Sequence, residues 1–256
     1  MSTIFNHFQD LTLTDDQRNA LEKIEKFLSS DAQIFILKGY AGSGKTTLLK
    51  GLVRYLQEEK TQCQVMAPTG RAAKILRKKV GQGATIHRTI YAFDDVETDD
   101  ETYKYRYPVR INEAEGQALI VDEASMIGEE SVFGQGSLLS DLMEFVYVGD
   151  RCRLLIIGDT AQLPPIHTEL SPALDSDRLS FVYHKEVVEG ALTDVVRQGR
   201  KSGILYNATR LRKRIEHFKD HFRIRITPFK DVVLLENASE LQEALLEAYE
   251  ESGVEE

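Results

Sequence analysis

Eight residues near the N-terminus, Gly39-Tyr40-Ala41-Gly42-Ser43-Gly44-Lys45-Thr46, match the pattern G-x-x-x-x-G-K-[ST]. Glycines at these positions let backbone N–H groups curl around a phosphate, and a helix that starts at the lysine adds positive potential. We expect Lys45 to reach the β- and γ-phosphates of ATP and the Thr46 hydroxyl to ligate Mg²⁺. The alternative is a glycine-rich turn with a chance lysine, but an apolar run precedes the loop and a helical pattern follows it. The pattern therefore predicts an ATP site made by Gly39, Ala41, Gly42, Ser43, Gly44, Lys45, Thr46 and the adjoining Thr47.

An acidic pair, Asp122-Glu123, directly follows the apolar run 118–121. At the carboxyl end of a parallel strand such a pair faces the ligand crevice. We expect Asp122 to hold Mg²⁺ through a water molecule and Glu123 to orient or deprotonate the attacking water. The alternative is a solvated acidic pair that ends a strand, and the phosphate loop upstream favours the metal site.

A third polar segment, Gly158-Asp159-Thr160-Ala161-Gln162-Leu163-Pro164-Pro165, follows the apolar run 153–157. Gln162 would enter the same crevice on a loop stiffened by two prolines. Its neutral amide could bond a γ-phosphate oxygen or the lytic water. Alone the motif is weak, since Gly-Asp after a strand is a common turn.

The strands and helices that position these residues are predicted from apolar runs that alternate with helical patterns. The sequence predicts strands over 33–37, 64–67, 118–122 and 153–157, and helices over 13–28, 45–57, 71–79 and 138–146, the first of them capped by Thr14. This order predicts an α/β fold in which a mostly parallel sheet is covered by helices on both faces.

Two regions depart from that alternation. Residues 91–116 combine an acidic run with Tyr103-Lys104-Tyr105-Arg106-Tyr107, which predicts a small inserted β-hairpin. Residues 201–256 predict a basic helix over 207–219, a short strand over 231–235 and an acidic helix over 239–250.

Composition and charge set the wider limits. The chain has 256 residues, 42% of them hydrophobic, and lacks both an apolar run of about 20 residues and a signal-peptide pattern, so we expect a cytoplasmic protein without a membrane partner. Cys63 and Cys152 suggest buried apolar residues and no disulfide framework. The net charge is −9, but residues 38–88 hold 11 basic residues against Glu58 and Glu59, so this stretch is +9 and the remainder −18. Such a basic segment keeps a nucleic-acid partner possible.

The ordered motifs resemble those of superfamily 1 DNA helicases, most closely the RecD-like branch that moves 5′ to 3′. The motifs that carry the resemblance are Gln17, the phosphate loop, 67–73 (Ala-Pro-Thr-Gly-Arg-Ala-Ala), 85–87 (Thr-Ile-His), 122–126 (Asp-Glu-Ala-Ser-Met), 158–165 and Leu192-Thr193-x-x-x-Arg197. The resemblance implies a RecA-like motor domain over 1–90 and 117–200, with the insert 91–116 at the position of a wedge-like hairpin. It also implies that Gln17 reads the adenine and that Arg197 touches the γ-phosphate.

By the same resemblance, single-stranded DNA would be gripped by Pro68, Thr69, Gly70, Arg71 and His87. A turn that opens a helix can hold a DNA phosphate through N–H groups and a hydroxyl without reading sequence. The alternative for Thr69 is a simple N-cap, and the alternative for His87 is a structural role. The tyrosines of the insert would suit stacking on bases at a DNA fork, or form only the hairpin's own core.

The chain departs from the family pattern after Arg197. The complete family has a second RecA-like domain, which carries its own DNA-binding motifs and an arginine that completes the ATP site. We find no match to those motifs here, and residues 201–256 resemble an extension leading to that absent domain. We therefore expect a piece of a two-domain helicase.

Two other functions stay open at this point. A small-molecule kinase shares the phosphate loop but offers no role for Asp122-Glu123 together with Gln162. A nucleotide-gated DNA-binding subunit of an exonuclease or recombination complex would share the motifs and add partner subunits.

The missing cross-cleft arginine yields a first prediction. The 256-residue chain should bind ATP but hydrolyse it slowly, because loss of such an arginine costs on the order of 10³ to 10⁵ in rate. Binding of a fluorescent ATP analogue and release of phosphate, measured beside Lys45→Ala, check both halves. Vigorous DNA-stimulated hydrolysis by this chain alone would contradict the expectation.

Overall fold

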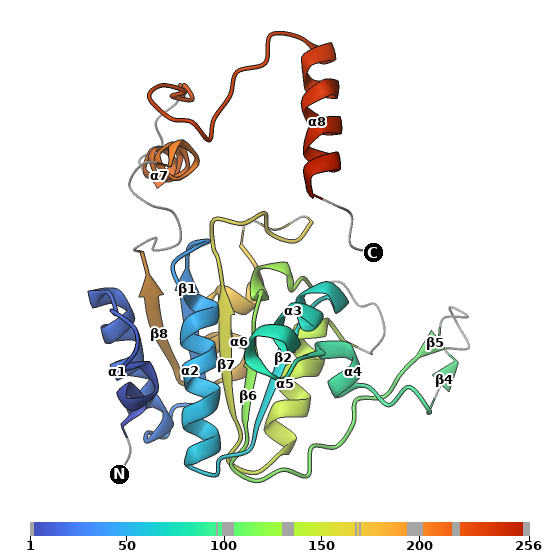
Figure 1. Ribbon diagram of the computed structural model, residues 1–256. Helices are drawn as coiled ribbons and strands as arrows, with labels where there is room; N and C mark the ends of the chain where they lie inside the picture. The colour runs from blue at the N-terminus through green and yellow to red at the C-terminus, as the bar shows by residue number, and fades with distance from the viewer. Residues whose placement is uncertain are drawn as a thin grey trace. The chain divides into compact units, whose positions relative to one another are not determined.

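The structure is a computed structural model that describes residues 3–95, 97–98, 105–129, 136–166, 168, 170–193, 202–216 and 221–252 (Figure 1). The chain divides into two units, Met1–Arg197 and Gln198–Glu256. The first unit holds the sheet.

Six strands form a single all-parallel sheet in the order β3-β2-β6-β7-β1-β8. The central strand β7 pairs with β1 from Ile34↔Leu154 to Lys38↔Gly158. This architecture confirms the predicted α/β fold class. The strands are β1 (Ile34–Gly39), β2 (Cys63–Ala67), β3 (Ala84–Thr85), β6 (Ala118–Val121), β7 (Arg153–Gly158) and β8 (Val187–Leu192).

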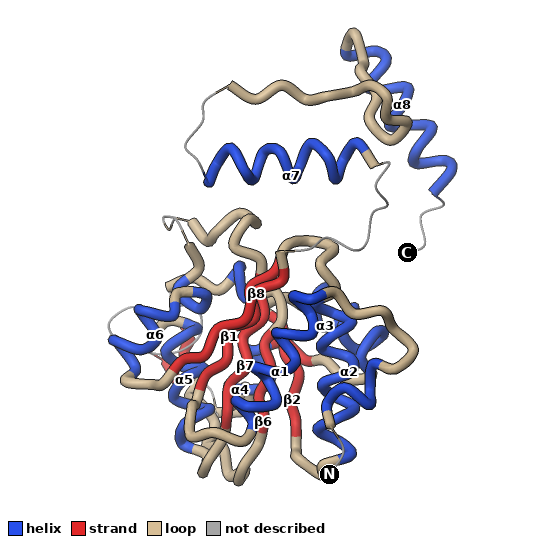
Figure 2. The backbone as a smooth tube through the Cα atoms, turned by 90° about the vertical axis from the view of Figure 1, so that its left-hand side faces the viewer, coloured by secondary structure: helices blue, strands red, loops and turns tan. Residues whose placement is uncertain are grey.

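Helices cover both faces of the sheet because successive strand residues point to opposite sides. Phe35 and Leu37 of β1 join one core cluster with the first three helices, and Ile34 and Ile36 join the other with the next three. Figures 1 and 2 show these two layers. The first layer contains α1 (Asp15–Leu28), α2 (Lys45–Glu58), α3 (Gly70–Val80) and the short helix η1 (Ile4–Phe8); the second contains α4 (Ile86–Ile90), α5 (Leu138–Val148), α6 (Ser176–Tyr183) and the turns η2 (Ala124–Met126) and η3 (Pro172–Leu174).

The insert contains a two-stranded antiparallel pair, β4 (Glu97–Thr98) with β5 (Tyr105–Arg106). Tyr103 lies outside the described residues, and for Tyr105 only the backbone is described. The Tyr107 ring packs 4.8 Å from the Phe93 ring and against the second core cluster. Tyr107 therefore serves apolar packing at the base of the insert.

The second unit contains α7 (Gly203–Glu216) and α8 (Ala238–Ser252). The predicted strand over 231–235 is wrong, because these residues form no strand. Asp231 instead caps the start of α7: its carboxylate accepts bonds from the Gly203 N–H at 2.7 Å and the Ser202 hydroxyl at 2.6 Å. With Val233 and Leu234 about 70% exposed, the segment finds no strand to pair with among the described residues.

Among the helices that the structure describes, none combines the length and apolar character that a bilayer span requires.

A buried polar contact joins the end of α4 to α5 and gives a second prediction. The Tyr91 hydroxyl donates to an Asp141 carboxylate oxygen at 2.6 Å, and both residues are almost fully buried. Tyr91→Phe should lower the free energy of unfolding by about 1–3 kcal/mol, since it removes a donor from a buried carboxylate. Urea denaturation measures the change.

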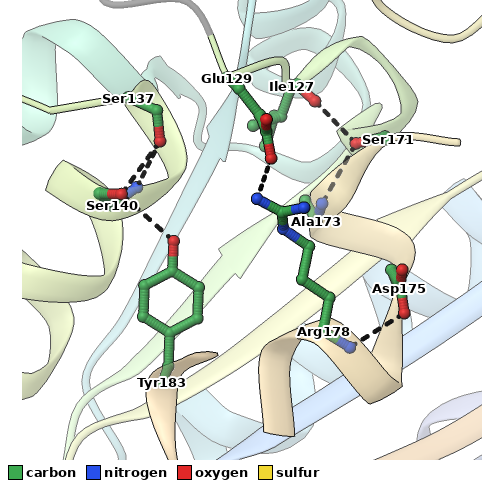
Figure 3. A network of polar contacts seen from close by, with 9 residues as sticks. All are labelled: Ile127, Glu129, Ser137, Ser140, Ser171, Ala173, Asp175, Arg178 and Tyr183. Atoms are coloured by element: carbon green, nitrogen blue, oxygen red, sulfur yellow. Dashed lines mark hydrogen bonds and ion pairs between the residues drawn. The ribbon is translucent and has the colours of Figure 1, made fainter. Parts of the chain in front are cut away.

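Tyr183→Phe is the matched control, because the Tyr183 hydroxyl meets a neutral partner, Ser140, at 3.3 Å (Figure 3). If Tyr91→Phe were no more destabilising than this control, the Tyr91–Asp141 bond would not be a significant support of the second layer.

Candidate functional site

Apart from Gln17 on α1, the candidate segments that the structure describes follow the carboxyl ends of parallel strands, so they meet along one edge of the sheet. The phosphate loop follows β1, the acidic pair follows β6 and the Gln162 loop follows β7, and these three strands are neighbours in the order β6-β7-β1. The segments 68–71 and 86–87 follow β2 and β3, which lie together on the β6 side. The phosphate loop, the acidic pair and Gln162 therefore lie together at one part of this edge, which we call the phosphate half. The segments 68–71 and 86–87 lie at the neighbouring part, which we call the second polar half.

The phosphate loop has the backbone that its glycines permit. Gly42 and Gly44 adopt positive φ values of 83° and 93°, which side-chain-bearing residues rarely adopt. Gly44 is also the N-cap of α2, so the N–H groups of the first turn of α2 point toward the loop. The sequence therefore places an anion-binding turn at the end of a buried strand.

Lys45 lies folded against the loop it belongs to. Its ammonium donates to the carbonyl oxygens of Gly39 at 2.6 Å and Tyr40 at 3.0 Å. The ammonium is therefore held over the loop, at the place where the predicted phosphates would lie.

Gln17 reaches the same loop from α1 and does so through a helix cap. The Thr14 side chain accepts from the Gln17 N–H, and the Gln17 side-chain oxygen accepts from the Thr14 N–H at 3.1 Å. The Gln17 amide nitrogen donates to the Ser43 carbonyl at 2.9 Å. A side chain at Gly44 would collide with that amide, since an added Cβ would lie 2.5 Å from it. Gln17 is thus tied to the phosphate loop, and its reading of adenine stays a prediction.

Asp122 is nearly buried at the end of β6. Burial raises the pKa of its carboxyl from 3.8 to about 6, an effect that the Glu123 N–H bond at 2.9 Å and the charges of Lys45 and Lys79 partly oppose. Glu123 has a positive φ of 56°, a conformation that costs a non-glycine residue roughly 1–2 kcal/mol. The adjacent acids therefore occupy an environment that disfavours an unliganded charge and strains the backbone.

Ser125 holds Gln162 in place, and sequence reasoning had given this serine no role. The buried Ser125 hydroxyl donates to the Gln162 side-chain oxygen at 2.8 Å, which joins the turn after β6 to the loop after β7. The serine falls in the quoted 122–126 motif, so its position two residues after the acidic pair was the available signal.

The turn that carries Ser125 has its own support from η3. The buried Ser171 hydroxyl makes a 2.8 Å contact with the carbonyl oxygen of Ala124. It makes another 2.8 Å contact with the carbonyl oxygen of Ile127 and accepts from the Ala173 N–H (Figure 3). Arg178 of α6 forms an ion pair with Glu129 just beyond the turn. The second helical layer therefore fixes the backbone that presents the acidic pair.

The second polar half consists of two helix starts. Thr69 caps α3 by accepting from the Ala72 N–H at 3.2 Å, and Thr85 caps α4 by accepting from the Arg88 N–H at 3.1 Å. Arg71 is exposed on the first turn of α3, and an added Cβ at Gly70 would meet no atom within 4 Å. His87 is half-buried, and burial lowers its pKa. Thr69 is thus the N-cap that the structural alternative expected, and its contact with DNA stays a prediction.

Arg197 lies outside the described residues. The chain leading toward it is fixed at the end of β8, where the Thr193 N–H donates to the Asp16 carboxylate of α1 at 2.8 Å.

A cavity of about 510 Å³ collects most of the residues predicted to bind ATP and metal. The described residues contain no group of three or more His, Cys, Asp or Glu side chains able to hold a metal ion, so a cation here would also need phosphate oxygens, as Mg²⁺ commonly does. The oxygen donors present fit Mg²⁺ bound to a nucleotide. The cavity is lined by Leu11, Thr12, Leu13, Gln17, Ala41, Gly42, Gly44, Lys45, Thr46, Thr47, Asp122, Glu123 and Gln162.

The fold and this loop define the class of P-loop nucleoside triphosphatases. Residues 12–227 match the protein family described as "AAA domain". The chain belongs to this family and, within it, to the N-terminal motor region of the RecD/Dda/Pif1-like superfamily 1 helicases.

The chain is similar in sequence to named relatives and similar in fold to a solved structure. The chain is 28% identical to the ATP-dependent RecD2 DNA helicase of Deinococcus radiodurans over 77% of this chain and 23% of the relative. It is 31% identical to the ATP-dependent DNA helicase dda of enterobacteria phage T4 over 72% of this chain and 39% of the relative. The Pif1 helicase of Candida albicans shares the fold, with a TM-score of 0.54 and 20% identity over 96% of this chain and 56% of that one. The chain thus spans less than half the length of these two sequence relatives.

The buried acid gives a third prediction. Asp122→Asn should raise the stability of the chain at neutral pH by ~1–3 kcal/mol, because folding forces the wild-type carboxylate into a buried site. Since the folded pKa of about 6 exceeds the unfolded value of 3.8, wild-type stability falls as pH rises between these values. The advantage of the variant should therefore grow over that range and level off above it.

Thermal unfolding at about pH 4.5 and pH 7.5 measures this, with the exposed Asp94→Asn as control. An equal effect of Asp122→Asn at both pH values would contradict the assigned environment.

Proposed function

We propose that the chain is the ATP-dependent motor domain of a DNA helicase, which binds and hydrolyses Mg²⁺-ATP and grips single-stranded DNA. The proposal is carried by one observation, the side-by-side position of two polar halves at the carboxyl edge of a single sheet. Family membership supports it, since the named relatives are ATP-dependent DNA helicases.

In the phosphate half, each group has a defined task. Mg²⁺, when bound, would neutralise charge on the β- and γ-phosphates, held by Thr46 and by Asp122 through water. Lys45 would leave the carbonyls of its own loop to pair with the γ-phosphate. Glu123 would position and deprotonate the attacking water. Gln162, fixed through Ser125, would present its amide nitrogen to the γ-phosphate or that water.

In the second half, phosphate groups of a DNA strand would meet two helix starts. Thr69 and the first N–H groups of α3 offer donors at a positive helix end, and Arg71 adds a mobile charge. Such contacts hold any sequence equally, which suits a motor that must pass along every base. His87 would contact the same strand from the first turn of α4, and Pro68 would shape the turn before α3.

Other parts of the proposal rest on the family alone. They are the reading of adenine by Gln17, the γ-phosphate contact of Arg197, movement from 5′ to 3′, and a fork-facing insert. They also include partners in a nuclease or recombination complex, in which the same chain would act mainly as a nucleotide-gated DNA-binding subunit. A small-molecule kinase fits less well, because it leaves the 68–71 and 86–87 segments without a task.

Two variants, one in each half of the site, test the proposal through their separate effects on ATP binding and on DNA binding. Lys45→Ala should reduce affinity for a fluorescent ATP analogue at least about tenfold, because it removes the charge over the phosphates. Thr69→Ala combined with Arg71→Ala should weaken binding of labelled oligothymidylate about tenfold, by removal of phosphate contacts. Fluorescence anisotropy follows both ligands with each variant.

Glu123→Gln serves as the control for hydrolysis, since it should bind ATP and release no phosphate. A kinase would ignore DNA in every arm. The helicase proposal would be wrong if the chain bound ATP but had no measurable affinity for single-stranded DNA.

A further inference from the structure

A second cleft, of about 570 Å³, opens beside the nucleotide cavity and has no task in the proposed function. Four cations line it, Lys50 and Arg54 from α2 and Lys78 and Lys79 from α3. Thr46 and Thr47 line both the cleft and the nucleotide cavity, so the two are neighbours. We call this group of four cations and their surroundings the α2–α3 cleft.

The far wall of the α2–α3 cleft is anchored at several points. This wall is η1 with the residues after it, and Phe8 packs so closely on Gly51 of α2 that an added Cβ there would lie 2.1 Å from the ring. The Ile4 N–H donates to Glu25 at 2.9 Å, and His7 lies 3.2 Å from Glu58. The cleft is therefore a built feature of the first helical layer.

Cations outnumber acids in the lining of the cleft. None of the four cations takes part in an ion pair within the described part of the chain, and Asp10 is the only acid among the described residues that line the cleft. In a protein of net charge −9, four clustered cations beside a single lining acid indicate an anionic ligand.

The positive charge also continues out of the cleft along α3. Arg71, Lys74 and Lys78 are exposed and follow one another at helical spacing of three and four residues, so they lie on one side of α3. At ~1.5 Å per residue the row from Arg71 to Lys78 extends about 10 Å along the helix. This row of cations connects the Thr69 turn, at the start of α3, to the cleft at its end.

We propose that the α2–α3 cleft and the outer side of α3 form a binding track for the sugar–phosphate backbone of DNA beyond the sheet-edge contacts. The inference rests on the proposed function and extends its DNA site. A row about 10 Å long can contact more than one successive phosphate of a nucleic-acid strand. One small anion would use only part of it. An acidic polypeptide is the other polyanion that such a row could hold, and the continuity with the Thr69 turn favours DNA.

The dependence of affinity on DNA length tests the track. Labelled oligothymidylates of about 6 and about 16 nucleotides are bound to the full chain, to a cleft variant (Lys50→Ala, Arg54→Ala, Lys78→Ala) and to a control variant (Lys26→Ala, Lys60→Ala, Lys230→Ala). The control removes the same number of exposed cations from outside the cleft. Anisotropy is recorded across a salt series.

The wild type and the control should bind the longer strand at least about tenfold more tightly than the shorter one. The cleft variant should bind the short strand like the wild type, lose most of the gain with length, and show a salt slope lower by about 2 for the long strand, at ~0.7 per phosphate contact. Unchanged ATP-analogue and short-strand affinities show that the variant is folded.

Two results would overturn the track while leaving the proposed function intact. One is a cleft variant that matches the control on the long strand. The other is a cleft variant that loses affinity only for a polyglutamate peptide, which would assign the cleft to an acidic polypeptide. If the wild type bound neither oligonucleotide, the proposed function itself would fail.

Discussion

The common direction of the six strands is the constraint on which the site depends. Both faces of the sheet are buried by helices, so polar side chains have little place on the strands themselves. The chain therefore changes from apolar to polar where each strand ends, and parallel strands end on the same edge. Strand order then decides which polar segments become neighbours: β6, β7 and β1 bring together two acids, an amide and a phosphate loop. These lie 40 to 120 residues apart in the sequence yet form one cavity.

Two features of the site, at Glu123 and Asp122, lower the stability of the folded chain. Glu123 is held at positive φ and the Asp122 carboxylate is buried enough to raise its pKa. Both features are unfavourable in an isolated domain, and both become useful if a cation and phosphates occupy the cavity. The surrounding structure compensates through ordinary means, such as the Ser171 contacts that fix the turn after β6.

The sequence predicted correctly those elements that are determined by residues close together in the chain. The long apolar runs of β1, β6 and β7, the Thr14 cap and the glycines of the phosphate loop each carry their structure within a few residues, and the structure confirms them. Strand β8 was missed because Glu189 and Gly190 interrupt its apolar run. Gly190 lies against Phe35, whose ring would be 3.0 Å from an added Cβ, so only the fold explains this glycine.

Long-range contacts explain the remaining differences. The 231–235 segment has the composition of a strand, but a strand also needs a neighbour, and Asp231 is used to cap α7. The 122–126 motif marks Ser125, but its partner Gln162 lies 37 positions away, so only the fold reveals the bond between them. Arg197 falls outside the described residues, and its place in the site rests on the family pattern alone.

The contacts of α1 have a mechanical consequence. At its first turn the helix holds the Ser43 carbonyl of the phosphate loop through Gln17, and it holds Thr193, at the end of β8, through Asp16. The phosphate loop and the end of β8 are therefore both held by the same helical turn. The start of α1 thus ties the phosphate loop to the end of β8, and its capping box fixes the turn that makes both contacts.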